Sequence, residues 1–168
     1  MAIEASGEIT DSTPNDLVVF LRANPAAYRA RPVVLIDSLG GKIAAGLELG
    51  RIFRKIGVTA IVARISPGAV MLDSGSCFSA CVYALMGAST RIAPGQSRIG
   101  VHRMFSYDGD SRRFDNGEMA VWLKRYAGAM GVSPELVAAA ERGGDAMRIL
   151  TPAEIVRWRL ARVQPGLL

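Results

Sequence analysis

The sequence predicts a mixed α/β fold in a single domain spanning residues 1–168. Two short apolar runs rich in β-branched residues, 32–37 and 58–63, have the pattern of strands buried on both faces of a sheet. Between them lie a glycine-containing break at 38–41 and apolar residues of nearly helical period over 42–56. Strand, turn, helix and strand in this order form a βαβ unit, whose crossover is expected to be right-handed. The length also suits one domain with a substantial core.

The N-terminal part is expected to form a strand and then a helix. Residues 2–10 alternate in part between apolar and polar side chains, which is typical of a strand. Residues 11–14 offer hydroxyl and carboxylate caps followed by a proline in the first helical turn. That helix is expected to end near Asn24 and Pro25, because proline cannot continue it. Gly57 is placed to end the 42–56 helix as a left-handed cap.

The second half is expected to alternate loops, short strands and helices. A loop over 65–75 precedes a helix of small residues from about 76 to 86. Two short strands, 90–93 and 98–102, flank the turn at Pro94-Gly95, and a polar surface loop follows over 106–117. Three further helices are expected over 118–130, from about 133 to 143, and from 151 to about 161.

Composition and charge exclude several classes of protein. The net charge is +5, from 20 basic and 15 acidic residues, but the basic residues are scattered and no aromatic-interleaved patch accompanies them, so no nucleic-acid function is expected. The longest candidate apolar run, Val82 to Met86, is far shorter than the about 18 residues of a transmembrane segment. Residues 1–4 do not begin a signal peptide. The chain as given is therefore expected to be cytoplasmic, or periplasmic or secreted if a leader was removed.

Ser79 and His102 are the first candidates for chemistry. Ser79 lies near the N-terminus of a predicted helix, where free amides stabilise negative charge. The Ala80 N–H would face a developing oxyanion, and the Gly40-Gly41 turn would supply a second donor. From spacing alone, however, a small residue chosen for tight packing explains Ser79 better. His102 is the only imidazole available as a base, although a lone histidine at a strand end is more often bonded to a backbone carbonyl.

Cys77 and Cys81 lie four residues apart on either side of Ser79. Either thiol would be a nucleophile at a helix start, and with His102 the two would make three metal ligands. No fourth ligand is evident, so no metal and no cofactor are expected. Two cysteines are too few for a disulfide scaffold. The sequence favours two small buried residues and leaves their redox state open.

Several short motifs follow one another in a recognisable order along nearly the whole chain. They are Gly7-Glu8-Ile9, Ser38-Leu39-Gly40-Gly41 with Ala45-Gly46, Ser79 with its small neighbours, Gly87 to Arg91, Ser97 to His102 and Leu150 to Glu154. In this order the sequence resembles the Clp protease proteolytic subunit family of the ClpP/crotonase superfamily. The Cys-x-Ser-Ala-Cys form looks more like a poorly characterised bacterial ClpP-like branch.

The resemblance implies a ClpP/crotonase-like fold of repeated ββα turns and the activity of a serine peptidase. Carried over by position, the nucleophile falls on Ser79, the base on His102, and the oxyanion amides on Gly41 and Ala80. Peptide bonds would be hydrolysed through an acyl-enzyme, and the substrate would be a peptide or an unfolded protein. The family also implies a homo-oligomer in rings, while an ATPase or adaptor partner stays open.

The sequence departs from the family pattern in its third catalytic member. The position of the family's orienting aspartate is matched by Met147. Asp145, two residues away, would serve if the loop shifts, and Glu141 is a poorer candidate. Without this member the chain would be a catalytically weak or inactive binding or assembly module. A crotonase-like acyl-thioester enzyme, which uses a similar oxyanion hole without a Ser-His pair, is a further alternative.

Two other departures concern the loops. The segment 65–75, directly before the predicted nucleophile helix, is longer than in typical Clp subunits, so it would shape or cover the site. The segment 105–140, where the family carries its ring-stacking handle, is short, so a double ring does not follow from the resemblance.

Overall fold

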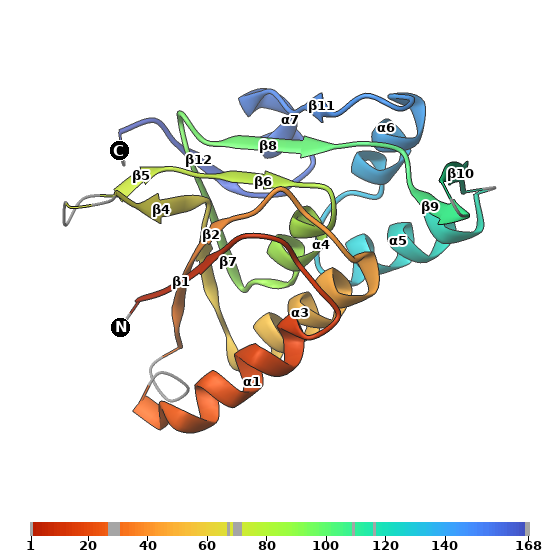
Figure 1. Ribbon diagram of the computed structural model, residues 1–168. Helices are drawn as coiled ribbons and strands as arrows, with labels where there is room; N and C mark the ends of the chain where they lie inside the picture. Colours follow the sequence, from red (N-terminus) through yellow and green to blue (C-terminus); the bar gives the residue numbers. More distant parts are fainter. Residues whose placement is uncertain are drawn as a thin grey trace.

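A sheet of five parallel strands forms the centre of the protein in the computed structural model (Figure 1). The structure describes residues 2–26, 31–66, 68, 72–108, 110–115 and 117–166. In spatial order the strands are β1 (Ala2–Ser6), β2 (Val33–Asp37), β3 (Thr59–Ile61), β7 (Thr90–Pro94) and β12 (Arg162–Gln164). Every neighbouring pair is parallel. The βαβ unit expected around 32–63 therefore sits in this sheet.

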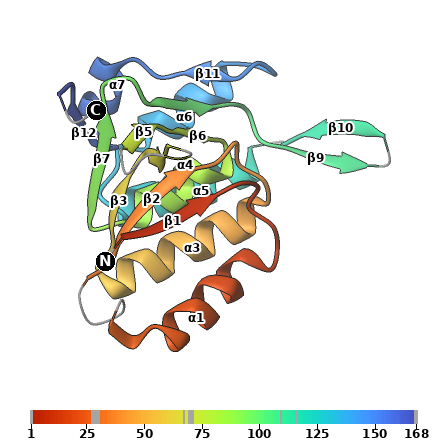
Figure 2. The ribbon, with the colours of Figure 1, turned by 60° about the vertical axis from the view of Figure 1, so that its left-hand side comes forward.

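Helices α1 (Thr13–Ala23) and α3 (Ile43–Ile56) run next to each other beside β1 (Figure 2). The apolar period of α3 buries Leu49 and Phe53, which explains why this stretch docks on the sheet as a helix. Gly57 ends α3 with φ +72°, the left-handed cap expected from the sequence.

Helix α4 (Ala80–Gly87) is buried along its whole length and contacts α3 through glycines. A Cβ on Gly46 would lie 2.5 Å from the Ala80 carbonyl oxygen, and a Cβ on Gly87 would overlap the Gly50 carbonyl oxygen. A side chain at any of these glycines would push the helices apart. The backbones of α3 and α4 are therefore in direct contact, and nothing larger than hydrogen fits between them there.

A second, three-stranded sheet carries the segment before α4. Strand β6 (Ser76–Phe78) pairs in parallel with β8 (Arg98–Val101), and β11 (Arg148–Ile149) pairs antiparallel with β8. The expected helix start near residue 76 is therefore wrong, because helix α4 begins at Ala80 and the three residues 76–78 are strand. Their backbone groups are taken by β8 and by Ser38, whose N–H donates to the Ser76 carbonyl at 2.7 Å.

Two antiparallel hairpins replace the loops expected at 65–75 and 106–117. The first pairs β4 (Ala63–Ile65) with β5 (Leu72–Ser74), and the second pairs β9 (Phe105–Asp108) with β10 (Ser111–Phe114). Residues 67, 69–71, 109 and 116 of these loops lie outside the described residues. Figure 2 shows the β9–β10 hairpin projecting away from the body of the molecule.

The C-terminal part contains α5 (Glu118–Ala129), α6 (Glu135–Arg142) and α7 (Pro152–Arg157). Thr151 caps α7 in a capping box with Glu154, and the hydrogen bond from the Thr151 N–H holds the pKa of the Glu154 carboxyl below its usual range. Helix α7 ends at Arg157 rather than near 161, because the chain turns there to add β12 at the sheet edge. None of the helices within the described ranges is long and apolar enough to cross a bilayer.

Candidate active site

Ser79 sits alone in the turn between β6 and α4. Its N–H donates to the Gly100 carbonyl of β8 at 3.0 Å, so the strand pairing fixes the residue directly before the helix. Its backbone has φ 54° and ψ −122°, a conformation that L-residues other than glycine rarely adopt. Such a conformation costs about 1–3 kcal/mol and persists only where the surroundings enforce it. The turn therefore holds the half-buried Ser79 side chain directly before a helix that is buried along its whole length.

His102 follows β8 directly and contacts Ser79. Its Nε2 lies 2.8 Å from Ser79 Oγ, and its Nδ1 lies 2.7 Å from the carbonyl oxygen of Arg103. A carbonyl oxygen only accepts hydrogen bonds, so Nδ1 must carry the ring proton. The lone pair on Nε2 is then free to accept the Ser79 hydroxyl proton. The structure thus brings together the two residues singled out in the sequence, and it also shows the carbonyl bond expected of a structural histidine.

The backbone amides of Gly41 and Ala80, on the two segments that meet at Ser79, have no hydrogen-bond partner among the described residues. The Ile9 N–H donates to the Gly40 carbonyl and the Lys42 N–H donates to the Ile9 carbonyl, both at 2.8 Å, so the Gly41 N–H points away from Ile9. Ala80 is the first residue of α4, and its N–H has no carbonyl one turn earlier. Among the residues that the structure describes, neither amide donates to a hydrogen bond.

The glycine turn lies directly against Ser79. A Cβ on Gly40 would lie 2.8 Å from the Ser79 Cβ and 3.2 Å from the Ala80 nitrogen, and Gly40 has φ +102°. Only glycine combines this backbone angle with so close an approach. Gly41 and Ala80, whose amides have no hydrogen-bond partner among the described residues, thus lie on two segments that meet at Gly40 and Ser79.

The structure does not bring Asp145 to the imidazole. Asp145 is exposed, and the described residues contain no hydrogen bond between it and His102. Met147 packs its sulfur against Gly100, where a Cβ would lie 2.9 Å from it. The Arg103 carbonyl occupies the Nδ1 side of the ring instead. An orienting role for Asp145 stays a prediction for which this structure gives no contact.

A disulfide joins Cys77 to Cys81 across the Ser79 turn, with the two Cα atoms 5.3 Å apart. Both residues are fully buried, as expected, but they are not free thiols. The sequence left their redox state open, because the partner of a cysteine depends on how the chain folds around it. Both sulfurs are used in this bond, and the described residues contain no group of three or more metal-ligating side chains.

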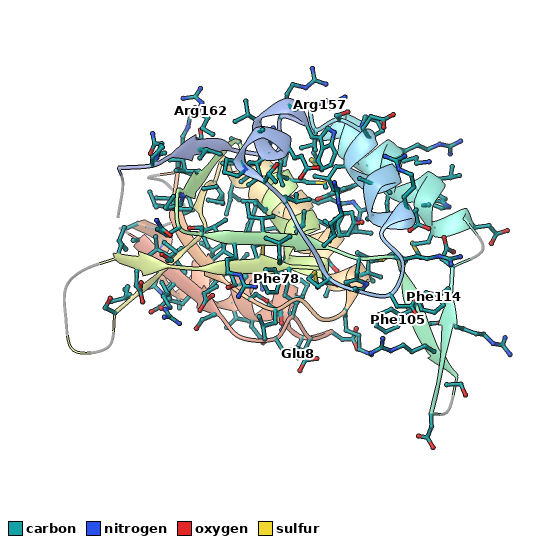
Figure 3. All side chains as sticks on the ribbon, turned by 90° about the horizontal axis from the view of Figure 1, so that it is seen from above. Glu8, Phe78, Phe105, Phe114, Arg157 and Arg162 are labelled. Atoms are coloured by element: carbon teal, nitrogen blue, oxygen red, sulfur yellow. A yellow bond between two sulfur atoms is a disulfide. The ribbon has the colours of Figure 1, made fainter. Side chains whose placement is uncertain are left out.

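Aromatic and charged side chains surround the imidazole on the hairpin side. The Phe105 ring lies 5.3 Å from the His102 ring, and the Phe114 ring lies 6.1 Å from Phe105. Figure 3 shows Phe105 and Phe114 side by side at the base of the β9–β10 hairpin. The guanidinium of Arg103 covers the Phe114 ring at 5.1 Å. The hairpin therefore forms one wall beside the Ser79–His102 pair.

On the other side, a hollow of about 590 Å³ opens beside Gly40 and Gly41. Glu8, Asp37 and Arg64 supply the charged side chains of its lining. The Arg64 guanidinium lies 3.9 Å from Asp37 and also bonds Asp73. The hollow gives a ligand room next to the unpaired Gly41 amide.

Comparison with known proteins points to one fold. No protein-family model matches the sequence, and no curated protein sequence matches it. Among solved structures, the membrane-bound stomatin-specific protease 1510-N, as its S97A mutant, matches with a TM-score of 0.71 and 17% identity over 96% of this chain and 77% of that chain. The K138A mutant of that protease, in complex with a substrate peptide, matches with a TM-score of 0.72 and 19% identity over 96% and 73%. ClpP1 from Listeria monocytogenes matches with a TM-score of 0.67 and 16% identity over 98% and 91%. The fold expected from the sequence is therefore confirmed: this chain has a ClpP-like α/β fold.

Proposed function

We propose that the protein is a serine peptidase that hydrolyses peptide bonds through an acyl-enzyme on Ser79. The observation that carries the proposal is the 2.8 Å contact between Ser79 Oγ and His102 Nε2, with the ring proton held on Nδ1. A serine hydroxyl is a weak nucleophile on its own, and it needs a base in hydrogen-bond contact to lose its proton. His102 is in that position.

The reaction follows from the positions of these groups. Ser79 Oγ forms a bond to the carbonyl carbon of the substrate while its proton passes to His102 Nε2. The negative charge that develops on the carbonyl oxygen is stabilised by the N–H groups of Gly41 and Ala80. His102 then gives its proton to the leaving amine as the peptide bond breaks. A water molecule, deprotonated by His102 in the same way, releases the acyl group and restores Ser79.

A peptide is the proposed substrate. One structural neighbour is a protease solved with a substrate peptide, and another is ClpP1. An extended chain is proposed to lie between the hollow beside Gly41 and the hairpin wall beside His102. A homo-oligomer is proposed on the same likeness in fold.

One observation favours a second candidate, a catalytically weak or inactive module for binding or assembly. The Nδ1 of His102 faces a neutral carbonyl rather than a carboxylate, so the imidazolium formed during acylation is less stabilised than in a Ser-His-Asp triad. This candidate predicts no turnover by the wild type and unchanged partner binding in His102→Ala.

The experiment is covalent labelling by a fluorophosphonate, which reacts with activated serines. The wild type is compared with Ser79→Ala, His102→Ala and the control Ser76→Ala, which removes a hydroxyl three residues earlier, in strand β6. We expect labelling of the wild type and of Ser76→Ala, none of Ser79→Ala, and a loss of about 10²–10⁴-fold in His102→Ala. Labelling of Ser79→Ala to the same extent as the wild type would refute the assignment of Ser79 as the nucleophile. A folded wild type that does not label would favour the binding module.

A further inference from the structure

We propose that Arg103 is the positioning residue of this site: its carbonyl oxygen orients His102, and its side chain holds that carbonyl in place. The inference rests on the proposed function, because it assigns to a main-chain group the role that a third catalytic side chain would otherwise have. The starting observation is the 2.7 Å contact between His102 Nδ1 and the Arg103 oxygen.

The peptide unit that carries the acceptor is anchored on both sides. Before it, the Arg103 N–H donates to the Gly144 carbonyl at 3.4 Å. After it, the Met104 carbonyl accepts from the Asp115 N–H at 2.9 Å. These two bonds come from segments far away in the sequence. They limit rotation of the Arg103–Met104 peptide plane, and hence the direction of its oxygen.

The Arg103 side chain ties the same segment to a helix end. Its Nη2 donates to the Asp115 carbonyl at 3.0 Å. The Asp115 carboxylate in turn accepts from the N–H groups of Gly117, Met119 and Ala120 at 3.0–3.2 Å, at the start of α5. Arg103 is thereby connected to the frame of α5 through a single residue.

Glu141 provides a carboxylate partner for the Arg103 guanidinium. Arg103 Nε lies 3.8 Å from Glu141 Oε2, and the other carboxylate oxygen, Oε1, is buried and has no hydrogen-bond partner among the described residues. The Glu141 side chain is partly exposed, and the Arg103 guanidinium is a charged partner for its carboxylate. The pair therefore keeps the guanidinium in position between α6 and the hairpin.

Together these contacts account for a histidine that is oriented without a carboxylate. The carbonyl selects the tautomer with the proton on Nδ1, and the side-chain contacts keep that carbonyl aimed at the ring. A misplacement of the imidazole by about 1 Å costs about 10²-fold in rate. Loss of the Arg103 side chain should therefore reduce reactivity by up to that amount, even though the side chain touches neither Ser79 nor the substrate.

The test uses the fact that the protein has only one histidine, so ¹⁵N-histidine labelling gives the ring signals of His102 alone. Spectra at about pH 9, above the ordinary range of histidine titration, show which nitrogen carries the proton. We expect the proton on Nδ1 in the wild type. We expect a mixture of the two tautomers in Arg103→Met, together with fluorophosphonate labelling slowed about 10- to 100-fold. Arg103→Lys should recover part of the rate, because it keeps the charge beside Glu141.

The control is Arg98→Met. Arg98 lies at the start of β8, the strand that His102 follows, and its guanidinium covers the Phe78 ring at 5.6 Å. It should leave the His102 spectrum and the labelling rate unchanged. A wild-type proton on Nε2 would overturn the carbonyl role. If Arg103→Met folds and shows the same His102 spectrum and labelling rate as the wild type, the role of the Arg103 side chain is overturned. If Arg103→Met does not fold, the same comparison with Arg103→Lys decides. Failure of the proposed function looks different: the wild type would not label, while its ring spectrum still showed the Nδ1 proton.

Discussion

Reduction of the Cys77–Cys81 disulfide is predicted to destabilise the protein by about 2 kcal/mol and to slow the reaction of Ser79. The bond closes a sequence separation of four residues. The chain-entropy relation for a loop of this length gives about 1.9 kcal/mol at 25 °C. For a protein of this size, each kcal/mol shifts the melting temperature by about 2–4 °C, so the expected loss is about 4–8 °C.

The effect on reactivity follows from the strain inside the same loop. Ser79 has φ 54°, and such a conformation costs about 1–3 kcal/mol. In the folded state the disulfide is a covalent restraint across this turn. Without it, Ser79 is expected to leave this conformation part of the time, and its Oγ then loses the contact with His102.

The assay compares melting curves and fluorophosphonate labelling rates of the wild type with and without a reductant. The variant Cys77→Ala/Cys81→Ala serves as control, since it should resemble the reduced wild type and should not respond to the reductant. Thiol titration of the unfolded protein establishes the redox state of each sample. A difference in melting temperature below about 1 °C between verified oxidised and reduced samples would refute the reasoning.

Three further predictions concern stability. Gly87→Ala should lower the free energy of unfolding in urea by about 1–3 kcal/mol, because its Cβ would overlap the Gly50 carbonyl. The control Gly128→Ala, whose Cβ would lie in open space, should be neutral or stabilising, and equal effects of the two substitutions would contradict the close helix contact. Burial raises the pKa of Tyr126 to about 12, so the stability that this phenol contributes is complete below about pH 10 and is lost as the pH rises toward 12. The stability of Tyr126→Phe should therefore decline less at alkaline pH, and identical alkaline profiles of the two proteins would argue against the burial. Because the pKa of Glu154 is lowered, its contribution to stability is present above the ordinary pKa of 4.5 and is lost as the pH falls through the lowered pKa. Glu154→Gln should therefore be slightly less stable than the wild type at neutral pH and equally stable in acid. A loss of stability that persists in acid would count against a role of the charge.

The strands and helices with strong local signals are those that the sequence predicts well. The run at 32–37 became β2 (Val33–Asp37), and the period over 42–56 became α3, ended by Gly57. In both, the residues themselves carry the preference, through β-branching or a helical apolar stripe. The segment around 76–78 became a strand against expectation, because its partners in β8 are distant in the sequence. The segment 106–114 became part of a local hairpin, which its polar residues did not indicate.

The candidate site, too, could be predicted from the sequence only in part. His102 stood out because it is the only imidazole in the sequence, and Ser79 because it lies near a predicted helix start; the resemblance placed them together. Their catalytic roles, and those of the Gly41 and Ala80 amides, stay predictions. The Arg103 carbonyl was missed, since every residue has a carbonyl and no residue type marks one that faces an imidazole.

The glycine contacts between α3 and α4 have a consequence for how this protein could be changed. The Gly41 amide leads into α3, and Ser79 and the Ala80 amide lead into α4. Because these helices touch backbone to backbone at Gly46, Gly50 and Gly87, the Ser79 turn and the Gly41 and Ala80 amides behave as parts of one rigid body. The hairpins β4–β5 and β9–β10 lie outside that body. Selectivity could therefore be redesigned by grafting new hairpins onto the scaffold, leaving the spacing of the reactive groups intact.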